Sequence, residues 1–292
     1  MRSRRALSRF GIRLYVLALV TALWPAHARA DWIVSAFGGV AHTQSSTMDL
    51  SLPLQGTHVT LTDVDYRGES FQSPQYYGLR GTWTPNDHRW MGIEAEWIHA
   101  KVYAEIDHPV HARGTLRGVP IDATIPLSSI VNRLSMSHGL NFILANVSAR
   151  HGFGPMDATG AHRLVGVVRA GAGPTLPHAE SQIDNVYFEQ YEGGGLGVQV
   201  GGGMEFSFWR GLGAIGEYKF TWASPDIEVA GGQAKIPSRS HHFAFGIQYR
   251  FRERCPVELT RFTPSAPPTD RSSSRGARAR STRRPPPRRA RR

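Results

Sequence analysis

The chain lacks features on which several common protein classes depend. One cysteine in 292 residues, Cys255, excludes a disulfide framework and a multi-cysteine zinc module. No apolar run after Asp31 approaches the roughly 18 residues that indicate a transmembrane helix. Residues 31–252 also lack excess positive charge, because 16 Lys and Arg stand against 20 Asp and Glu. A globally basic nucleic-acid-binding domain is therefore excluded, and no nucleic-acid partner is expected.

The net charge of +11 comes from the two ends of the chain. Residues 1–30 contribute six arginines and no acid, and residues 253–292 contribute 12 arginines against three acids. At the N-terminal end, arginines precede a short apolar stretch, and Ala28-Arg29-Ala30 then places small residues at both key positions of a cleavage site. This layout is typical of a secretory signal peptide over residues 1–30. We expect cleavage before Asp31, and an uncleaved interfacial anchor is the alternative.

Residues 31–252 contain eight segments of about 10–15 residues in which apolar and polar side chains alternate. Residues two apart in a strand share a face, so each segment has one apolar and one polar side. In the last segment, Phe243 and Phe245 share one face while His242 and Gln248 share the other. The segments are Trp32–Thr43, Gln72–Thr84, Arg89–Ala104, Ser137–Arg150, Arg163–Thr175, Gly194–Trp209, Leu212–Ala223 and Arg239–Phe251.

The connections between these segments alternate between long and short, at about 28, 4, 32, 12, 18, 2 and 15 residues. Outer-membrane barrels show this alternation, with short periplasmic turns and long external loops. We therefore predict an all-β fold, an eight-stranded antiparallel up-and-down transmembrane β-barrel over residues 31–252. A soluble lipocalin-like barrel is the alternative. The strand-like stretches Thr57–Tyr66 and Thr115–Ile125 would be hairpin extensions above the membrane, or an extra strand pair that makes ten strands.

Two groups of side chains support the predicted barrel: aromatic residues near the strand ends and charged residues that face the lumen. Two aromatic belts are expected where a barrel crosses the two membrane interfaces. Trp32, Trp83, Trp90 and Trp209 fall beside the predicted periplasmic ends, and Trp97, Tyr103 and Trp222 lie toward the other ends. An eight-stranded lumen is filled by side chains. We expect a paired acid–base network there, rather than a channel or a catalytic site, from Glu94, Glu96, Glu217, Lys219 and Arg250.

Residues 253–292 are dominated by Arg, Pro and Ser and have no apolar periodicity. This composition predicts a disordered C-terminal tail, which the barrel topology would place in the periplasm. The tail would attach electrostatically to anionic cell-wall polymer or to lipid headgroups. The alternative is a solvated, dispensable extension.

Three histidines are expected at the outer-leaflet rim of adjacent strands. His99, His138 and His178 lie near the outer ends of the third, fourth and fifth segments, Glu180 shares a face with His178, and Lys101 shares one with His99. Several imidazoles and a carboxylate suit a first-row metal ion. We predict His99, His178 and Glu180 as metal ligands, and Lys101 and His138 as catalytic residues, with a divalent or transition metal ion of undetermined identity. The alternative is that these side chains are ordinary headgroup contacts.

Six stretches carry a resemblance to a known family. They are AFGGVAHT (Ala36–Thr43), SFQSPQYYGLRGTW (Ser70–Trp83), GIEAEWIHAKVYAE (Gly92–Glu105), SHGLNFILANV (Ser137–Val147), GAGPTLPHAE (Gly171–Glu180) and GEYKFTWA (Gly216–Ala223). In this order they resemble the outer-membrane lipid A oxidases and cover most of the predicted strands. The Arg-rich tail and Pro174 depart from the family's pattern.

The resemblance implies a small barrel that uses dioxygen to oxidise the proximal glucosamine of lipid A to 2-aminogluconate. It also implies lipopolysaccharide and membrane lipids as partners, and the outer membrane of a Gram-negative bacterium as the location. His99, Lys101, His138, His178 and Glu180 would occupy matching positions. A non-enzymatic surface barrel for adhesion or envelope integrity is the alternative, because fold alone does not determine activity. A lipid A deacylase would need a Ser–His pair on one face, whereas the adjacent Ser137 and His138 are expected on opposite faces.

Overall fold

The computed structural model of the chain describes residues 30–156 and 161–251. The predicted signal peptide, apart from Ala30, and the predicted basic tail lie outside the described residues. Both therefore stay predictions. Among the described residues, no helix is long and apolar enough to cross a membrane.

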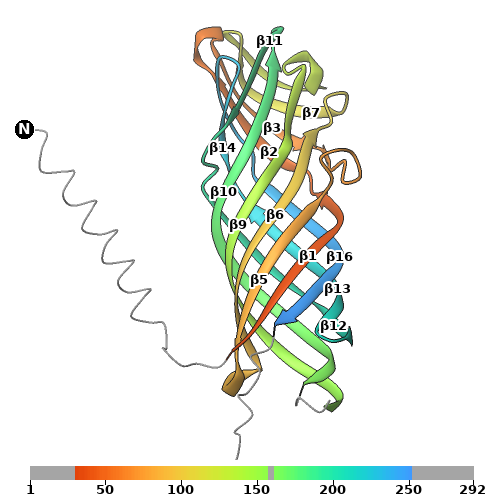
Figure 1. Ribbon diagram of the computed structural model, residues 1–292. Coiled ribbons are helices and arrows are strands. Elements are labelled where there is room, and N and C mark those ends of the chain that lie inside the picture. The colour runs from red at the N-terminus through yellow and green to blue at the C-terminus, as the bar shows by residue number, and fades with distance from the viewer. Residues whose placement is uncertain (1–29, 157–160, 252–292) are drawn as a thin grey trace, which may run out of the picture. The chain divides into compact units, whose positions relative to one another are not determined.

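Eight antiparallel strands close into a barrel (Figure 1). Each strand pairs with two neighbours, and the last pairs back with the first, so that Trp32 lies opposite Phe251 and Thr43 opposite Ser240. Closure leaves this barrel without an unpaired edge strand. In order around the barrel, the strands are β1 (Ala30–Thr43), β5 (Tyr77–Pro85), β6 (Met91–Ala104), β9 (Arg133–Met156), β10 (His162–Ile183), β12 (Leu196–Trp209), β13 (Leu212–Ala223) and β16 (Ser238–Phe251).

All eight predicted segments are strands of this barrel, which confirms the predicted fold class. Three of the predicted segments have wrong boundaries. The second barrel strand begins at Tyr77 rather than Gln72, because residues 68–76 form turns and bends around a cis Ser73–Pro74 peptide bond. Strands β9 and β10 are 24 and 22 residues long. β9 extends past its predicted range at both ends and β10 past its predicted end, because the two strands stay paired from Met156 opposite His162 to Arg133 opposite Gln182.

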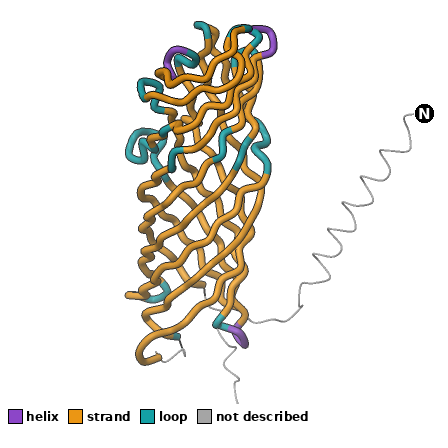
Figure 2. The backbone as a smooth tube through the Cα atoms, turned by 180° about the vertical axis from the view of Figure 1, so that it is seen from behind, coloured by secondary structure: helices purple, strands orange, loops and turns teal. Residues whose placement is uncertain are grey.

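Short and long connections lie at opposite ends of the barrel, as predicted. One end, which we call the turn end, carries the one-turn helix η2 (Asn86–His88) and the two-residue turn Arg210-Gly211. The other end, which we call the hairpin end, carries the long connections, and Figure 2 shows most loops gathered there.

The long connections at the hairpin end fold into further strands. A six-stranded second sheet has the order β14-β15-β2-β3-β7-β8. Hairpin extensions at Thr57–Tyr66 and Thr115–Ile125 are therefore confirmed, and the ten-stranded barrel is wrong. The remaining elements are β2 (Ser46–Leu52), η1 (Pro53–Gln55), β3 (Thr57–Val64), β4 (Tyr66–Arg67), β7 (Pro109–Leu116), β8 (Val119–Pro126), η3 (Leu127–Ser129), β11 (Val186–Tyr191), β14 (Asp226–Val229) and β15 (Gly232–Lys235).

The outer wall of the barrel is apolar. Phe245 and Val147 expose more than 60% of their surface, although both are large hydrophobic residues. A continuous exposed apolar wall is suited to hydrocarbon rather than to water, so the structure does not fit the soluble lipocalin-like alternative. Exposed aromatics gather at the turn end, as predicted for one interface belt: Trp32, Trp90, Trp209, Tyr249 and Phe251.

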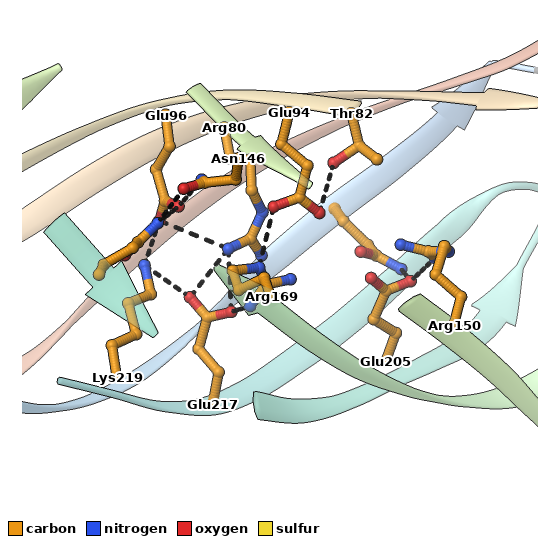
Figure 3. A network of polar contacts seen from close by, with 12 residues as sticks. Arg80, Thr82, Glu94, Glu96, Asn146, Arg150, Arg169, Glu205, Glu217 and Lys219 are labelled. Carbon is orange, nitrogen blue, oxygen red and sulfur yellow. Dashed lines mark hydrogen bonds and ion pairs between the residues drawn. The ribbon is translucent and has the colours of Figure 1, made fainter. Parts of the chain in front are cut away.

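Charged side chains fill the lumen, as Figure 3 shows from close by. Glu217 forms ion pairs with Arg80 at 2.9 Å and with Lys219 at 2.8 Å. Arg169 forms another with Glu94, also at 2.9 Å. The three basic and three acidic groups balance, so the network carries no net formal charge. These buried side chains occupy the lumen at this level, as is usual for a barrel of eight strands. Its charged members are Arg80, Arg169, Lys219, Glu94, Glu96 and Glu217.

The predicted acid–base network is therefore confirmed, with two arginines that the prediction did not include. A second ion pair lies closer to the turn end, where Arg150 Nη2 is 2.5 Å from Glu205 Oε2. Arg250, which was predicted to point inward, lies 3.9 Å from the same carboxylate.

The core beneath the second sheet is apolar instead of charged. Met48, Leu61, Leu127 and Val131 are fully buried there and belong to one hydrophobic cluster with residues of β9 and β10. In β2 and β3, buried Leu50 and Val59 alternate with polar neighbours, which gives the sheet one inner and one outer face. The described chain thus has a polar core inside the barrel and an apolar core at the hairpin end.

Candidate functional site

Four metal-ligating side chains meet near the hairpin end of β9 and β10. His138 lies on β9, His178 and Glu180 lie on β10, and Glu189 lies on β11. Their ligand atoms all lie within 4.8 Å of one another. His178 and Glu180 are buried, whereas His138 and Glu189 are exposed, so the group is open on one side. We call these four residues the rim cluster.

Each carboxylate of the rim cluster faces one histidine. Glu180 Oε1 lies 3.4 Å from His138 Nδ1, and Glu189 Oε1 lies 3.0 Å from His178 Nε2. The second oxygen of Glu180 lies 2.5 Å from the Arg133 guanidinium, which fixes the orientation of that carboxylate. Supporting contacts of this kind orient metal ligands in many proteins.

A tyrosine hydroxyl contacts the Glu189 carboxylate. The Tyr187 hydroxyl donates a hydrogen bond of 2.6 Å to Glu189 Oε2. This hydrogen bond lowers the pKa of the Glu189 carboxyl below its usual value, and it raises the pKa of Tyr187 to about 12. A carboxylate that remains deprotonated is available to bind a cation.

Local irregularities of the backbone bring these side chains together. The register between β9 and β10 shifts between Pro177 and Glu180, where the two strands depart from regular pairing. The His138 and His178 rings meet edge to face, with centroids 4.7 Å apart, and the His178 ring lies 4.0 Å from that of Tyr191. The shifted register and the ring contacts hold both imidazoles against the carboxylates.

His99, a predicted metal ligand, lies beside the rim cluster rather than within it. Its Nδ1 is 3.0 Å from Asn141 Oδ1, and its ring stacks on Tyr77 with centroids 4.9 Å apart. The close packing depends on Gly139, which has a φ of +102°, because a Cβ there would lie 2.4 Å from His99 Nδ1. His99 and His138 line the same groove on the barrel wall. Metal ligation by His99 stays a prediction.

Lys101, a predicted catalytic residue, is buried and turned toward the backbone. Its ammonium donates to the carbonyl oxygens of Gln72 at 3.3 Å and Ser73 at 3.4 Å, and it lies 5.6 Å above the Tyr103 ring. In this position Lys101 holds the turn that precedes β5. Contact with a lipid A phosphate stays a prediction, and it would require this turn to uncover the ammonium.

Ser137 and His138 make a contact that the sequence analysis did not expect. The two residues lie on opposite faces, as expected, but Ser137 Oγ still lies 3.1 Å from His138 Nδ1. Ser137 is buried and His138 is exposed, yet the hydroxyl reaches the near nitrogen of the ring. Glu180 approaches the same nitrogen. A serine relay needs the hydroxyl and the carboxylate on different ring nitrogens, so these three residues do not form one.

Glu189 is the rim-cluster residue that the sequence analysis missed, because residues 176–193 were assigned to an external loop. The structure folds this stretch into a hairpin in which Glu180 lies opposite Glu189 and His178 opposite Tyr191. The turn residues Asp184 and Asn185 both have positive φ. Asp and Asn in a two-residue connection are a known signal for this turn, and that signal would have identified the hairpin.

Two imidazoles and two carboxylates form a donor set that suits a first-row transition metal. A set of two histidines and one carboxylate with open positions is typical of non-haem ferrous iron sites. The exposed edge at His138 would leave room for a small molecule beside the ion. The residues present therefore fit a first-row transition metal ion that is open on one side.

No protein-family model matches this chain, and no curated protein matches it. Solved structures with a similar strand arrangement include Neisserial surface protein A, which is 10% identical, with 76% of this chain and 99% of that chain covered and a TM-score of 0.35. OprG, an outer membrane protein of Pseudomonas aeruginosa, is 11% identical, with 78% and 98% covered and a TM-score of 0.35. The outer membrane protein AlkL is 9% identical, with 80% and 95% covered and a TM-score of 0.34. These likenesses concern the fold alone, and the eight-stranded membrane-type barrel rests on the chain's own strand pairing.

Proposed function

We propose that this chain is an outer-membrane enzyme of a Gram-negative bacterium that oxidises lipid A. The reaction we assign is the dioxygen-dependent conversion of the proximal glucosamine to 2-aminogluconate. The observation that carries the proposal is the rim cluster, in which two histidines and two carboxylates converge within 4.8 Å at the hairpin end. Such a cluster is compatible with several metal-dependent reactions. We choose lipid A oxidation among them because the strand segments resemble those of lipid A oxidases.

The position of the rim cluster supports a lipid substrate. The apolar outer wall of the barrel faces hydrocarbon, and the second sheet continues beyond that wall at the hairpin end. If the hairpin end faces outward, the rim cluster lies where the sugar headgroups of the outer leaflet begin. An external orientation of the long connections is the usual one for such barrels.

Each residue near the rim cluster has a defined part in this proposal. His138, His178, Glu180 and Glu189 would hold the metal ion, and ferrous iron fits this donor set. Such an ion supplies dioxygen binding and electron transfer when bound. Arg133 orients Glu180 through its ion pair, and the Tyr187 hydroxyl orients Glu189 through its hydrogen bond.

Mass spectrometry of lipid A tests the proposal directly. Cells that lack the protein would be complemented with wild type, His178→Ala, Glu180→Gln or His241→Ala and grown in air. We expect lipid A with one added oxygen atom from wild type, and a loss of more than about 100-fold for either ligand variant. His241→Ala is the matched control, because His241 lies on β16 across the barrel and hydrogen-bonds Gln44 and Tyr218. Unchanged lipid A from cells with wild-type barrel in the outer membrane would contradict the proposal.

A non-enzymatic role in adhesion or envelope integrity is the second candidate, and the second sheet is the observation that favours it. Its outer face presents polar side chains such as Thr47, Asp49 and Ser51 away from the apolar core. If this role is correct, deletion of the gene leaves lipid A unchanged and alters cell attachment or detergent sensitivity. Substitutions on that face, with the rim cluster intact, would then reproduce the defect.

A further inference from the structure

A groove of about 470 Å³ opens on the barrel wall directly beside the rim cluster. We call it the wall groove. His138 belongs to both sites, so the groove and the rim cluster are continuous. The residues that line the groove and carry the argument below are Tyr77, Trp97, His99, Asn141, Ile143 and Leu176.

The wall groove faces the membrane and not the lumen. In β9, Ile143 lies on the same face as the exposed Val147, whereas Phe142 and Leu144 point inward and are buried. Leu176 on β10 is likewise exposed, at 41% of its surface. A molecule that enters this groove would therefore arrive sideways from the bilayer, with its apolar part against Ile143 and Leu176.

The polar part of the groove contains an acceptor that no described residue satisfies. Asn141 Nδ2 donates to the carbonyl oxygens of Gly139 and Leu176, so Asn141 Oδ1 is the acceptor toward His99 Nδ1. The His99 ring then carries its proton on Nδ1, and Nε2 is left as a lone-pair acceptor. His99 is only 4% exposed, and its Nε2 is a buried atom that has no hydrogen-bond partner among residues 30–156 and 161–251. An unsatisfied buried acceptor is costly, which indicates that a bound donor completes it.

Aromatic rings surround this acceptor. Tyr77 stacks on His99 and meets the Trp97 ring edge to face at 5.3 Å. Trp97 Nε1 also donates to Asn141 Oδ1 at 3.2 Å, which fixes the indole. Flat aromatic faces beside hydrogen-bonding groups suit a sugar ring, whose C–H face is apolar and whose hydroxyl groups are donors.

We propose that the wall groove binds one glycolipid molecule of the outer leaflet and presents its sugar to the rim cluster. A sugar hydroxyl donates to His99 Nε2, the sugar ring packs on Tyr77 and Trp97, and an acyl chain lies along Ile143 and Leu176. The fate of the bound sugar rests on the proposed function, but its binding does not. His99 is thereby a substrate-binding residue, beside the metal ligands rather than among them.

Binding to purified protein tests the proposal without any turnover. The full chain would be refolded in detergent micelles, and retained lipid A would be counted by native mass spectrometry against added phosphatidylglycerol. We expect His99→Phe, which removes the acceptor, and Leu176→Trp, which fills the groove, each to weaken lipid A binding about tenfold. His241→Phe and Leu196→Trp are the matched controls, because Leu196 is exposed on β12 outside the groove. The heat-dependent shift in gel mobility of folded barrels shows that each variant is folded.

The possible results separate the groove from the proposed reaction. Equal lipid A retention by the groove variants and their controls would overturn the proposal, as would no retention by folded wild type. Displacement of lipid A by an equal amount of phosphatidylglycerol would overturn the assignment of a glycolipid. Specific retention by wild type, lost in both groove variants, upholds the groove even if lipid A from cells is unmodified, in which case only the proposed oxidase function fails.

Discussion

At the scale of the residue, an ion pair outside the barrel wall has a predictable pH dependence. His108 Nδ1 lies 3.0 Å from Asp65 Oδ2, and Ser45 Oγ hydrogen-bonds the other carboxylate oxygen. The hydrogen bonds from Ser45 and His108 lower the pKa of Asp65 below its ordinary 3.8. The hydrogen bond to Asp65 raises the pKa of His108 above its ordinary 6.5. The pair therefore contributes its full stabilisation between pH 3.8 and pH 6.5, which are the ordinary pKa values of the two groups.

This stabilisation is lost in both directions of pH. As the pH falls through the lowered pKa of Asp65, the carboxylate is protonated, and as the pH rises through the raised pKa of His108, the imidazolium loses its proton. We expect Asp65→Asn to return the pKa of His108 toward 6.5, measured by NMR titration of its ring protons. Ser45→Ala should change the His108 titration much less. Identical His108 titrations in wild type and Asp65→Asn would show that the pair does not form.

At the scale of the element, the second sheet and the barrel wall should respond separately to mutation. Leu61 on β3 is fully buried in the apolar core at the hairpin end. We expect Leu61→Ala to destabilise the second sheet by about 2–5 kcal/mol, because it leaves a cavity in that core. Hydrogen exchange should accelerate in β2, β3 and β7 and not in β13 or β16. Thr47→Ala, at an exposed position of β2, is the control, and equal acceleration in β16 would show that barrel and sheet unfold as one unit.

The elements also differ in how far the sequence predicts them. Strands such as β13 and β16 alternate strictly because one face meets lipid and the other meets the lumen, so their position and orientation follow from the pattern. For the rim cluster, the pattern places His138, His178 and Glu180 at the same rim but does not bring in Glu189. The formation of the cluster depends on the register shift before Glu180 and on the hairpin that brings Glu189 opposite Glu180. The Ser137–His138 contact and the positive φ of Gly139 likewise arise from local backbone geometry that strand periodicity does not encode.

At the scale of the whole molecule, the charge balance of the lumen should govern the stability of the barrel. The ammonium of Lys219 is fully buried, hydrogen-bonds Glu96, lies 2.8 Å from Glu217 and lies 3.7 Å from the centroid of the Phe37 ring. Lys219→Met would leave three buried acids against two buried arginines in a site that water does not reach. Breaking a buried ion pair from one side costs about 3–5 kcal/mol, because a charge is left uncompensated.

The double variant Lys219→Met/Glu217→Gln restores equal numbers of buried acids and bases. We therefore expect it to recover part of the stability that Lys219→Met loses, although it has one more substitution. Urea unfolding of the refolded barrel in phospholipid vesicles measures both variants against wild type and against Glu217→Gln alone. If the cost of the double variant equals the sum of the two single costs, the lumen charges act independently and the argument from balance is wrong. If the double variant is more stable than Lys219→Met alone, the six charged side chains, which come from the four strands β5, β6, β10 and β13, act as one network inside the barrel.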